Sequence, residues 1–320
     1  MDSEAHALFE RSLRNAVKDH SGQALDAALE ELGWSGAMAI EPRAAISILF
    51  RLQGENNVSS SALGQVVLFG LGPSDKPVMG VVLPAMGEWD PPGTMDGHGL
   101  AVNGLAPAAL RAQESAIVVA STERGTRAVE VPTTSLTFER VRGIDPNIDF
   151  VRVSAADIGT FTDLGPTAPD WSSAVALARL ALAHELVGSC RTMLELAREH
   201  ALGRVQFDRP ISSFQAIRHR LADTLVAIEM ADAMIDAAWL DGTPDSAAMA
   251  KAVAGRQART AARHCQQVLA GIGFTTEHPL HLSVKRTLVL DGLFGSAVSL
   301  TRALGEEMVR AAQLPPLLPL

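Results

Sequence analysis

An arginine, a glutamine and a phenylalanine lie close together between two long stretches of helix-forming sequence. They are Arg204, Gln206 and Phe207, in the segment GRVQFDRPISSFQ. The guanidinium group of arginine is a rigid, forked cation that suits phosphate. Because Pro210 cannot continue a helix, we expect one helix to end near Gly203 and the next to begin at Pro210. Arg204 would then lie beside a helix N-terminus, whose free N–H groups and positive dipole end favour an anion.

Taken alone, these residues favour a plainer interpretation. In it, Arg204 makes a surface salt bridge within an ordinary pair of antiparallel helices. A phosphate site therefore needs support from elsewhere in the chain.

The composition narrows the classes of function. The length of 320 residues suggests two or three packed units, and abundant Ala and Leu with few aromatic residues favour helices. A net charge of −9 without a long basic run argues against nucleic acid, because phosphate backbones require clustered Lys and Arg. The first twenty residues lack the apolar core and cleavage site of a signal peptide, and we find no apolar run long enough for a membrane span. Cys190 and Cys265 lie in apolar helical sequence, which predicts buried thiols, no zinc site and a cytoplasmic location.

Hydrophobic patterning divides the chain into three zones. Residues 1–72 read as short helices, with Ser21 and Pro42 among the start signals. Residues 73–164 hold short β-branched runs separated by turn formers, which predicts a small antiparallel sheet or barrel. Residues 165–320 carry long apolar stripes at helical spacing, which predicts an antiparallel four-helix bundle. The expected fold class is therefore α+β, with a middle β-domain between two helical regions.

Two segments of the third zone resemble the signatures of acyl-CoA dehydrogenases. The pattern R-x-Q-F-x-x-P-I-x-x-F-Q begins at Arg204, and QQVLAGIGFTTEHPLHL, beginning at Gln266, is similar to the second signature. Their order, their separation and the helix–sheet–helix order of the chain suit that family. The resemblance implies an acyl-CoA dehydrogenase-like fold with a reduced N-terminal helical region. It is strong over residues 175–310, fair over 95–165 and weak before that.

In that family, the two signatures contact the pyrophosphate end of FAD across a dimer interface, so the FAD belongs mainly to the adjacent subunit. Carried over by position, the resemblance implies FAD contacts at Arg204, Gln206, Phe207, Gln267 and Gly271. A glycine at position 271 allows close approach of the backbone, although it equally suits an ordinary turn at a helix end. No metal site is implied.

The residues that would do the chemistry are missing. An acyl-CoA dehydrogenase removes the α-proton of its substrate with a carboxylate while the β-hydride passes to the flavin. In most members the carboxylate is a Glu in a Glu-Gly-Thr/Ser context, and the matching position in LVLDGLFGSA is Phe294, before Gly295 and Ser296. Other members place the Glu on the first bundle helix before an Arg, where this chain has Ala178 and Arg179. The resemblance therefore implies a chain with no catalytic residue of its own.

Two acidic residues remain as alternative bases. Asp291 lies about one helical turn before Phe294, and we expect it to be a polar residue at a helix end. Glu277 lies in the second signature, where an interface or capping role is expected. Five histidines in helical or signature segments are interpreted as packing or surface residues: His184, His200, His219, His264 and His278.

The segments that hold the isoalloxazine ring in the family are also altered. Members use a Thr/Ser-Glu-rich loop and a Trp-Ile-Thr/Ser strand end, and the matching places here read LGPSDKPVMG (71–80) and VNGLAPAALRAQ (102–113). GPSD is at most a remnant of the first, and no Trp stands in the second. The ADP-binding half of the site is thus retained while the ring-binding half is lost.

This asymmetry implies a non-catalytic subunit of a heteromeric FAD-dependent acyl-CoA dehydrogenase. The expected assembly is α2β2, in which the catalytic partner holds the FAD ring, the Glu and the acyl-CoA substrate, and this chain closes the ADP end. Such pairs resemble those of actinobacterial steroid catabolism, which oxidise bulky CoA thioesters. Two alternatives stay open: a self-sufficient flavin enzyme with an unusual base, and a scaffold or regulatory protein that has lost FAD binding.

Overall fold

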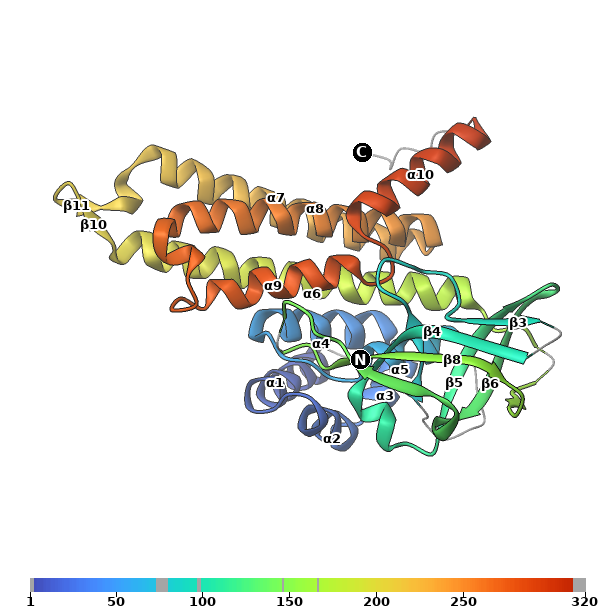
Figure 1. Ribbon diagram of the computed structural model, residues 1–320. Helices are drawn as coiled ribbons and strands as arrows, with labels where there is room; N and C mark the ends of the chain where they lie inside the picture. The colour runs from blue at the N-terminus through green and yellow to red at the C-terminus, as the bar shows by residue number, and fades with distance from the viewer. Residues whose placement is uncertain (1–2, 73–79, 97–98, 146, 166, 313–320) are drawn as a thin grey trace.

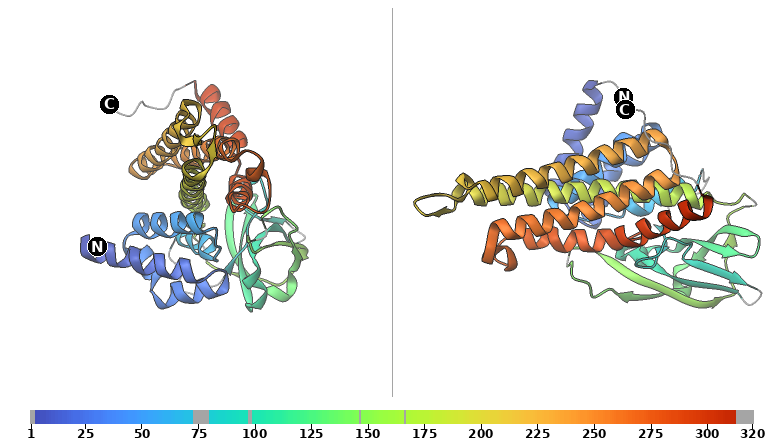
Figure 2. Two further views of the ribbon diagram at one scale, coloured as in Figure 1. Left: turned by 90° about the vertical axis from the view of Figure 1, so that its left-hand side faces the viewer. Right: turned by 90° about the horizontal axis from the view of Figure 1, so that it is seen from above.

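The computed structural model describes five ranges of the chain: 3–72, 80–96, 99–145, 147–165 and 167–312. Helices at both ends of the chain flank a region of short strands, so the α+β organisation expected from the sequence is confirmed (Figure 1). A helical bundle forms one layer of the molecule. The N-terminal helices and the sheet lie side by side along one face of this bundle (Figures 1 and 2).

The N-terminal region consists of five helices: α1 (Ser3–Asp19), α2 (Gln23–Glu31), α3 (Trp34–Ile40), α4 (Pro42–Asn56) and α5 (Ala62–Gly70). Pro42 occupies the first turn of α4, where its fixed φ is favourable. Ser21 does not cap α2, contrary to expectation, because Gly22 takes the N-cap position. The Ser21 hydroxyl instead accepts a hydrogen bond from the backbone N–H of Ser59.

The described strands are β1 (Gly80–Val81), β2 (Leu83–Pro84), β3 (Gly93–Asp96), β4 (Gly99–Pro107), β5 (Ser115–Thr122), β6 (Gly125–Pro132), β7 (Thr137–Arg140), β8 (Phe150–Ile158) and β9 (Thr162–Asp163). They form one sheet with the path β7-β8-β4-β3-β5-β6-β9. Most pairs are antiparallel, but β1 and β3 each pair with β5 in parallel. The sheet is therefore mostly antiparallel, as expected, but two parallel pairings depart from that expectation. The chain leaves β4 through the 3-10 turn η1 (Ala108–Ala112) and crosses to the far side of β3, so β5 runs in the direction of β3.

The C-terminal bundle consists of α6 (Trp171–Gly203), α7 (Gln215–Asp241), α8 (Pro244–Leu269) and α9 (Leu280–Gly292), and α10 (Ala297–Ala311) continues beyond it. Helix α6 is central, since it packs against α7, α8 and α9 and also against α4. Side chains cap α6 and α8 at their N-termini: Asp170 accepts from the backbone N–H of Ser173 in α6, and Thr243 accepts from that of Ser246 in α8.

Two glycines set the distance between α4 and α6. A Cβ added at Gly54 would lie 2.1 Å from the carbonyl oxygen of Glu185, and one added at Gly188 would lie 2.1 Å from that of Arg51. The two backbones therefore touch directly, and no larger residue fits at either position without moving a helix.

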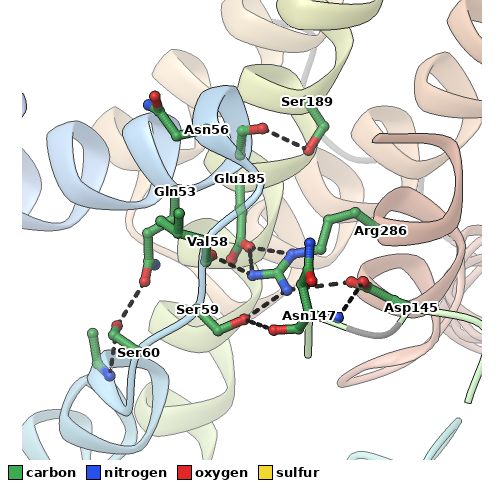
Figure 3. A network of polar contacts seen from close by, with 12 residues as sticks. Gln53, Asn56, Val58, Ser59, Ser60, Asp145, Asn147, Glu185, Ser189 and Arg286 are labelled. Atoms are coloured by element: carbon green, nitrogen blue, oxygen red, sulfur yellow. Dashed lines mark hydrogen bonds and ion pairs between the residues drawn. The ribbon is translucent and has the colours of Figure 1, made fainter. Parts of the chain in front are cut away.

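A buried polar network joins the three parts of the fold (Figure 3). At its centre is Arg286 of α9, which donates to Glu185 of α6 from Nε (2.9 Å) and Nη2 (2.6 Å). Its Nη1 donates to Asp145, between β7 and β8, and to the Ser59 hydroxyl, between α4 and α5. All three charged side chains are buried, so each relies on these partners in place of water.

Two helical segments of the chain are long and strongly apolar. By length and composition alone, Trp171–Gly203 and Leu280–Ala311 are apolar enough to span a membrane, which corrects the expectation that no such run exists. Most of the apolar stretch of α6 is nevertheless buried against other helices, as in the core helix of a globular protein. Cys190 and Cys265 are free and buried as expected, and burial raises the pKa of both thiols.

Candidate functional site

The segment between α6 and α7 folds into a small hairpin that projects from one end of the bundle (Figures 1 and 2). Strand β10 (Val205–Gln206) pairs with β11 (Arg209–Pro210) around a two-residue turn. The prediction that Pro210 opens the next helix is wrong. This residue has an extended ψ of 141° and pairs with Val205, and a 3-10 turn, η3 (Ile211–Ser213), separates it from α7.

The turn of the hairpin places a large aromatic residue in an unfavourable position. Phe207 and Asp208 have φ values of 52° and 62°, the left-handed region that Asn and Gly adopt most readily. The Phe207 side chain is 84% exposed to solvent. The ring meets that of Phe214 edge to face, with centroids 6.1 Å apart, but most of it lies in water. An exposed apolar ring on a strained backbone is typical of binding sites.

Arg204 immediately follows α6 and begins the hairpin. Its backbone N–H donates to the carbonyl of His200, and its own carbonyl accepts from the backbone of Ile211 at 2.8 Å. The side chain is exposed, and no ion pair within the described ranges engages its guanidinium group. The plainer interpretation, a surface salt bridge, therefore finds no support in the structure. Ser213, at the end of η3, has a buried hydroxyl without a hydrogen-bond partner in the part of the chain that is described.

The second signature segment also lies at the end of the bundle from which the hairpin projects. Gln267 lies exposed in the last turn of α8, and Gly271 lies exposed in the 3-10 turn η4 (Ala270–Phe274) that follows. The rings of His200 and His278 meet edge to face, with centroids 6.5 Å apart, and so connect the end of α6 to the chain that leaves η4. Burial lowers the pKa of His200, with smaller effects from His278 and Arg204.

The glycines of this turn play different roles. A Cβ at Gly273 would lie 2.9 Å from Cβ of Leu269, whereas a Cβ at Gly271 would meet open space. The residue with left-handed φ in the turn is Ala270, at 53°. Gly271 is therefore not required by packing or by φ, and it leaves bare backbone on the surface beside Gln267. A polar ligand could approach that backbone closely.

Phe294, at the position of the expected base, is buried in the junction between α9 and α10. It is 2% exposed, its φ is 54°, and its carbonyl accepts from Nε of Arg179 at 3.2 Å. Gly295 follows with a φ of 94°, and Ser296 caps α10 through a reciprocal pair of hydrogen bonds with Ser299. The junction is thus occupied by contacts within the chain.

Asp291 and Lys251 hold the same junction. Asp291 accepts a hydrogen bond from the backbone of Ala297 at 2.9 Å and pairs with Arg259, so both of its oxygens are engaged. Lys251 of α8 is completely buried, and its Nζ donates to the carbonyls of Asp291 (3.0 Å) and Gly295 (3.2 Å). Burial lowers the pKa of Lys251 to about 7. These contacts make Asp291 a poor candidate for a base, because its carboxylate already caps a helix and pairs with a cation.

The other alternative base and the histidines make no catalytic cluster. Glu277 is exposed after η4. His184 accepts from Nε1 of Trp239 at 3.0 Å, and burial lowers its pKa to about 3. His264 contacts the Thr224 hydroxyl at 3.1 Å. Within the described ranges, no group of three or more His, Cys, Asp or Glu residues is arranged to hold a metal.

Of the two segments expected to face a flavin ring, the second has other partners. The GPSD remnant lies almost wholly within residues 73–79, outside the described residues. The second segment forms β4 and η1, where Leu110 is buried and the Gln113 side chain accepts from the backbone of Gly80. The loop 85–91 instead reaches the α9–α10 junction, where Trp89 lies under the guanidinium group of Arg179 at 5.5 Å.

Four residues of these contacts were missed from the sequence. Trp89 gave no signal, because its loop lies between the two segments compared with the family. Lys251 could have been noticed, since it stands among alanines on the apolar face of α8. Glu185 and Arg286 lie on apolar helix faces in the same way, and a charge at such a position indicates a buried partner.

Comparison with known proteins supports the family resemblance. Residues 171–308 match the family model of the acyl-CoA dehydrogenase C-terminal domain. Acyl-CoA dehydrogenase IpdE2 of Mycobacterium tuberculosis is 44% identical over 121 residues, 38% of each chain. FadE34 of the same organism is 38% identical over 159 residues, which cover 44% of this chain and 22% of its own. The chain therefore matches less than half the length of either relative.

Solved structures resemble the whole chain. A Tcur3481-Tcur3483 steroid ACAD variant superposes with a TM-score of 0.80 at 20% identity, covering 97% of this chain and 99% of the other. A chain of the ChsE4-ChsE5 complex from Mycobacterium tuberculosis superposes with a TM-score of 0.73 at 19% identity, covering 99% of both. At this identity the likeness shows the fold, which is that of the acyl-CoA dehydrogenases from end to end.

Proposed function

We propose that this chain, whose helical domain belongs to the acyl-CoA dehydrogenase family and whose whole length has that fold, is the non-catalytic subunit of a heteromeric acyl-CoA dehydrogenase. Its catalytic partner holds the FAD ring, the catalytic Glu and the CoA thioester. This chain supplies contacts to the ADP end of that FAD across the interface and is inactive alone. The complex is cytoplasmic and has the composition α2β2.

The observation that carries the proposal is the contrast between the two halves of the site. Every residue assigned to the ADP end is exposed at one end of the bundle, and Phe207 holds an apolar ring in water there on a left-handed backbone. The junction that would hold the base is buried around Phe294 and closed by Lys251 and Asp291. A self-sufficient chain would need an open junction with a carboxylate in it as well as the exposed ADP contacts.

The residues present fit the ADP end of FAD and do not fit its ring. The Arg204 guanidinium would bind the pyrophosphate, and the bare backbone at Gly271 with the Gln267 amide would hydrogen-bond nearby polar atoms. Phe207 would cover the bound group and exclude water from it. FAD, when bound, supplies the acceptor for the hydride, and this chain provides no group that could take the α-proton.

The relatives support the wider assembly and the substrate class. One similar structure is described as a complex of two proteins, ChsE4 and ChsE5, and another as a steroid ACAD. By analogy, the partner oxidises a steroid-derived CoA thioester at its α,β bond.

Flavin content tests the proposal. The chain is purified alone and after co-expression with the acyl-CoA dehydrogenase homologue encoded beside it, and flavin absorbance and mass are measured. We expect a colourless chain alone and a yellow complex with one FAD per pair of subunits. A yellow chain that oxidises CoA thioesters by itself would overturn the proposal.

Arg204→Ala then tests the shared contact. We expect the complex to assemble and to lose FAD on gel filtration at least tenfold more readily than the wild type, because a charge-assisted bond to phosphate contributes about 1.5–3 kcal/mol. Arg310→Ala, an exposed arginine of α10, is the matched control and should retain flavin. Equal flavin retention in both variants would indicate a scaffold that does not touch FAD.

A further inference from the structure

The loop between β2 and β3 closes over the α9–α10 junction. The backbone N–H of Gly87 donates to the carbonyl of Gly292 at 2.9 Å, and a Cβ at Gly292 would lie 2.6 Å from the sulfur of Met86. Nε1 of Trp171, in the first turn of α6, donates to the carbonyl of Trp89 at 2.9 Å. The loop is thus fixed to the bundle at three points by Met86, Gly87 and Trp89.

The Trp89 side chain is partly buried and packs where α6, α8 and α10 meet, a place called the recess below. Arg179 of α6 covers one face of the indole, and the ring packs with a small apolar cluster of Ala248, Ala252 and Leu300. The contact with the turn is close, since a Cβ at Gly295 would lie 2.9 Å from Cε3 of Trp89. Gly295 is therefore the residue that leaves room for the ring.

We propose that this recess is a pocket for a flat aromatic ring and that Trp89 is its internal occupant. The inference rests on the proposed function, because the recess adjoins Phe294 and Arg179, which take the positions of the base and its neighbouring Arg in the family. The lost base and the filled pocket are then separate barriers to chemistry in this chain. No flavin ring or thioester enters while Trp89 occupies the recess.

Removal of the ring and its replacement by free indole test the pocket. Trp89→Gly is expected to lower the melting temperature, and added indole should restore it by a few degrees in a saturable manner. Wild-type protein and Glu88→Ala, which changes an exposed neighbour in the same loop, should show no saturable response. Arg179→Met in the Trp89→Gly background should weaken indole binding several-fold, because the cation that covers the ring is removed. If the glycine variant fails to fold, Trp89→Ala is measured in the same way, and Trp89→Phe should retain most of the stability.

The proposed pocket would be contradicted if the Trp89→Gly variant melted at the same temperature as the wild type. It would also be contradicted if added indole did not raise the melting temperature of the variant. Either result would leave the proposed function intact, since the chain would still be colourless alone. A wild-type chain that is yellow when purified alone would instead contradict the proposed function, regardless of the effect of indole on the melting temperature of Trp89→Gly.

Discussion

Two phenylalanines of this chain have a left-handed backbone, and their surroundings are opposite. Phe207 has a φ of 52° at the tip of the hairpin and is exposed, whereas Phe294 has a φ of 54° and is buried among core side chains. For an L-residue this conformation costs about 1–2 kcal/mol. Burial offsets the cost at Phe294, whereas the exposed Phe207 ring gains only an edge-to-face contact with Phe214, at a centroid distance of 6.1 Å. We propose that this difference separates a residue kept for packing from one kept for binding.

Phe207→Asn is therefore expected to stabilise the isolated chain by about 1 kcal/mol, because Asn adopts left-handed φ more easily and hydrates well. Chemical denaturation of the chain alone measures this gain. In the complex, the same variant should lose flavin faster. Phe274→Asn is the control, since Phe274 is exposed at the same end of the bundle without left-handed φ, and no stabilisation is expected there. A loss of stability in Phe207→Asn would show that the ring is needed for folding.

Phe294→Glu restores the carboxylate that the family resemblance expects but should restore no activity. The new charge would be buried beside Leu290 and Leu293, so we expect a loss of about 3 kcal/mol or more in the free energy of unfolding. Dehydrogenation of a CoA thioester by the variant supplied with FAD should stay at background. Phe294→Leu should fold better than the Glu variant. Turnover by Phe294→Glu alone would mean that ring binding survives in this chain.

At the scale of elements, the central contact of the fold is the crossing of α4 and α6. It depends on Gly54 and Gly188 at the contact and on cations that bridge to α7, where Arg51 and Arg191 both pair with Asp232. These contacts fix the N-terminal helices against the bundle, which in turn fixes Glu185 on α6.

Gly188→Ala should destabilise the chain by about 3 kcal/mol, because its methyl group would overlap the carbonyl of Arg51 and force the helices apart. Gly305→Ala is the matched control. Gly305 lies in α10 with open space around its Cα, so the substitution should be neutral or stabilise by up to about 1 kcal/mol. Thermal and chemical denaturation distinguish the two. Equal stability of both variants would mean that the crossing can relax.

At the scale of the molecule, the network around Arg286 ties the bundle to both other regions. It buries two carboxylates, Glu185 and Asp145, against one guanidinium group. Burial raises the pKa of Glu185, with a further contribution from Asp145, although Arg286 opposes the change. The buried charges are thus not balanced when both carboxylates are ionised.

This imbalance predicts a pH dependence. Since the pKa of Glu185 is raised in the folded chain, the folded state holds a proton that the unfolded state releases above about pH 4.5. The free energy of unfolding should therefore fall as pH rises from about 4.5 through the raised pKa. Glu185→Gln should remove that fall, whereas Glu199→Gln, exposed on the same helix, should not. Denaturation curves between pH 4.5 and 8 measure the difference, and parallel curves for wild type and Glu185→Gln would contradict the prediction.

The sequence by itself determined the order of helices, strands and bundle, because hydrophobic periodicity and turn residues act locally. It also determined the family resemblance of the segments around Arg204 and Gln267, which lie in short continuous motifs. It could not place Pro210 in a hairpin or β5 parallel to β3, because pairing with a distant strand overrides local preference.

Only the tertiary structure decided what fills the place of the missing base. Lys251 lies forty residues from Asp291, and Trp89 lies ninety residues from Arg179 in the sequence, so neither contact leaves a local pattern. Charges and aromatic rings on apolar faces indicate that a partner exists, but they do not identify it. The partner is set by how the helices cross, and that depends on the packing of the whole chain.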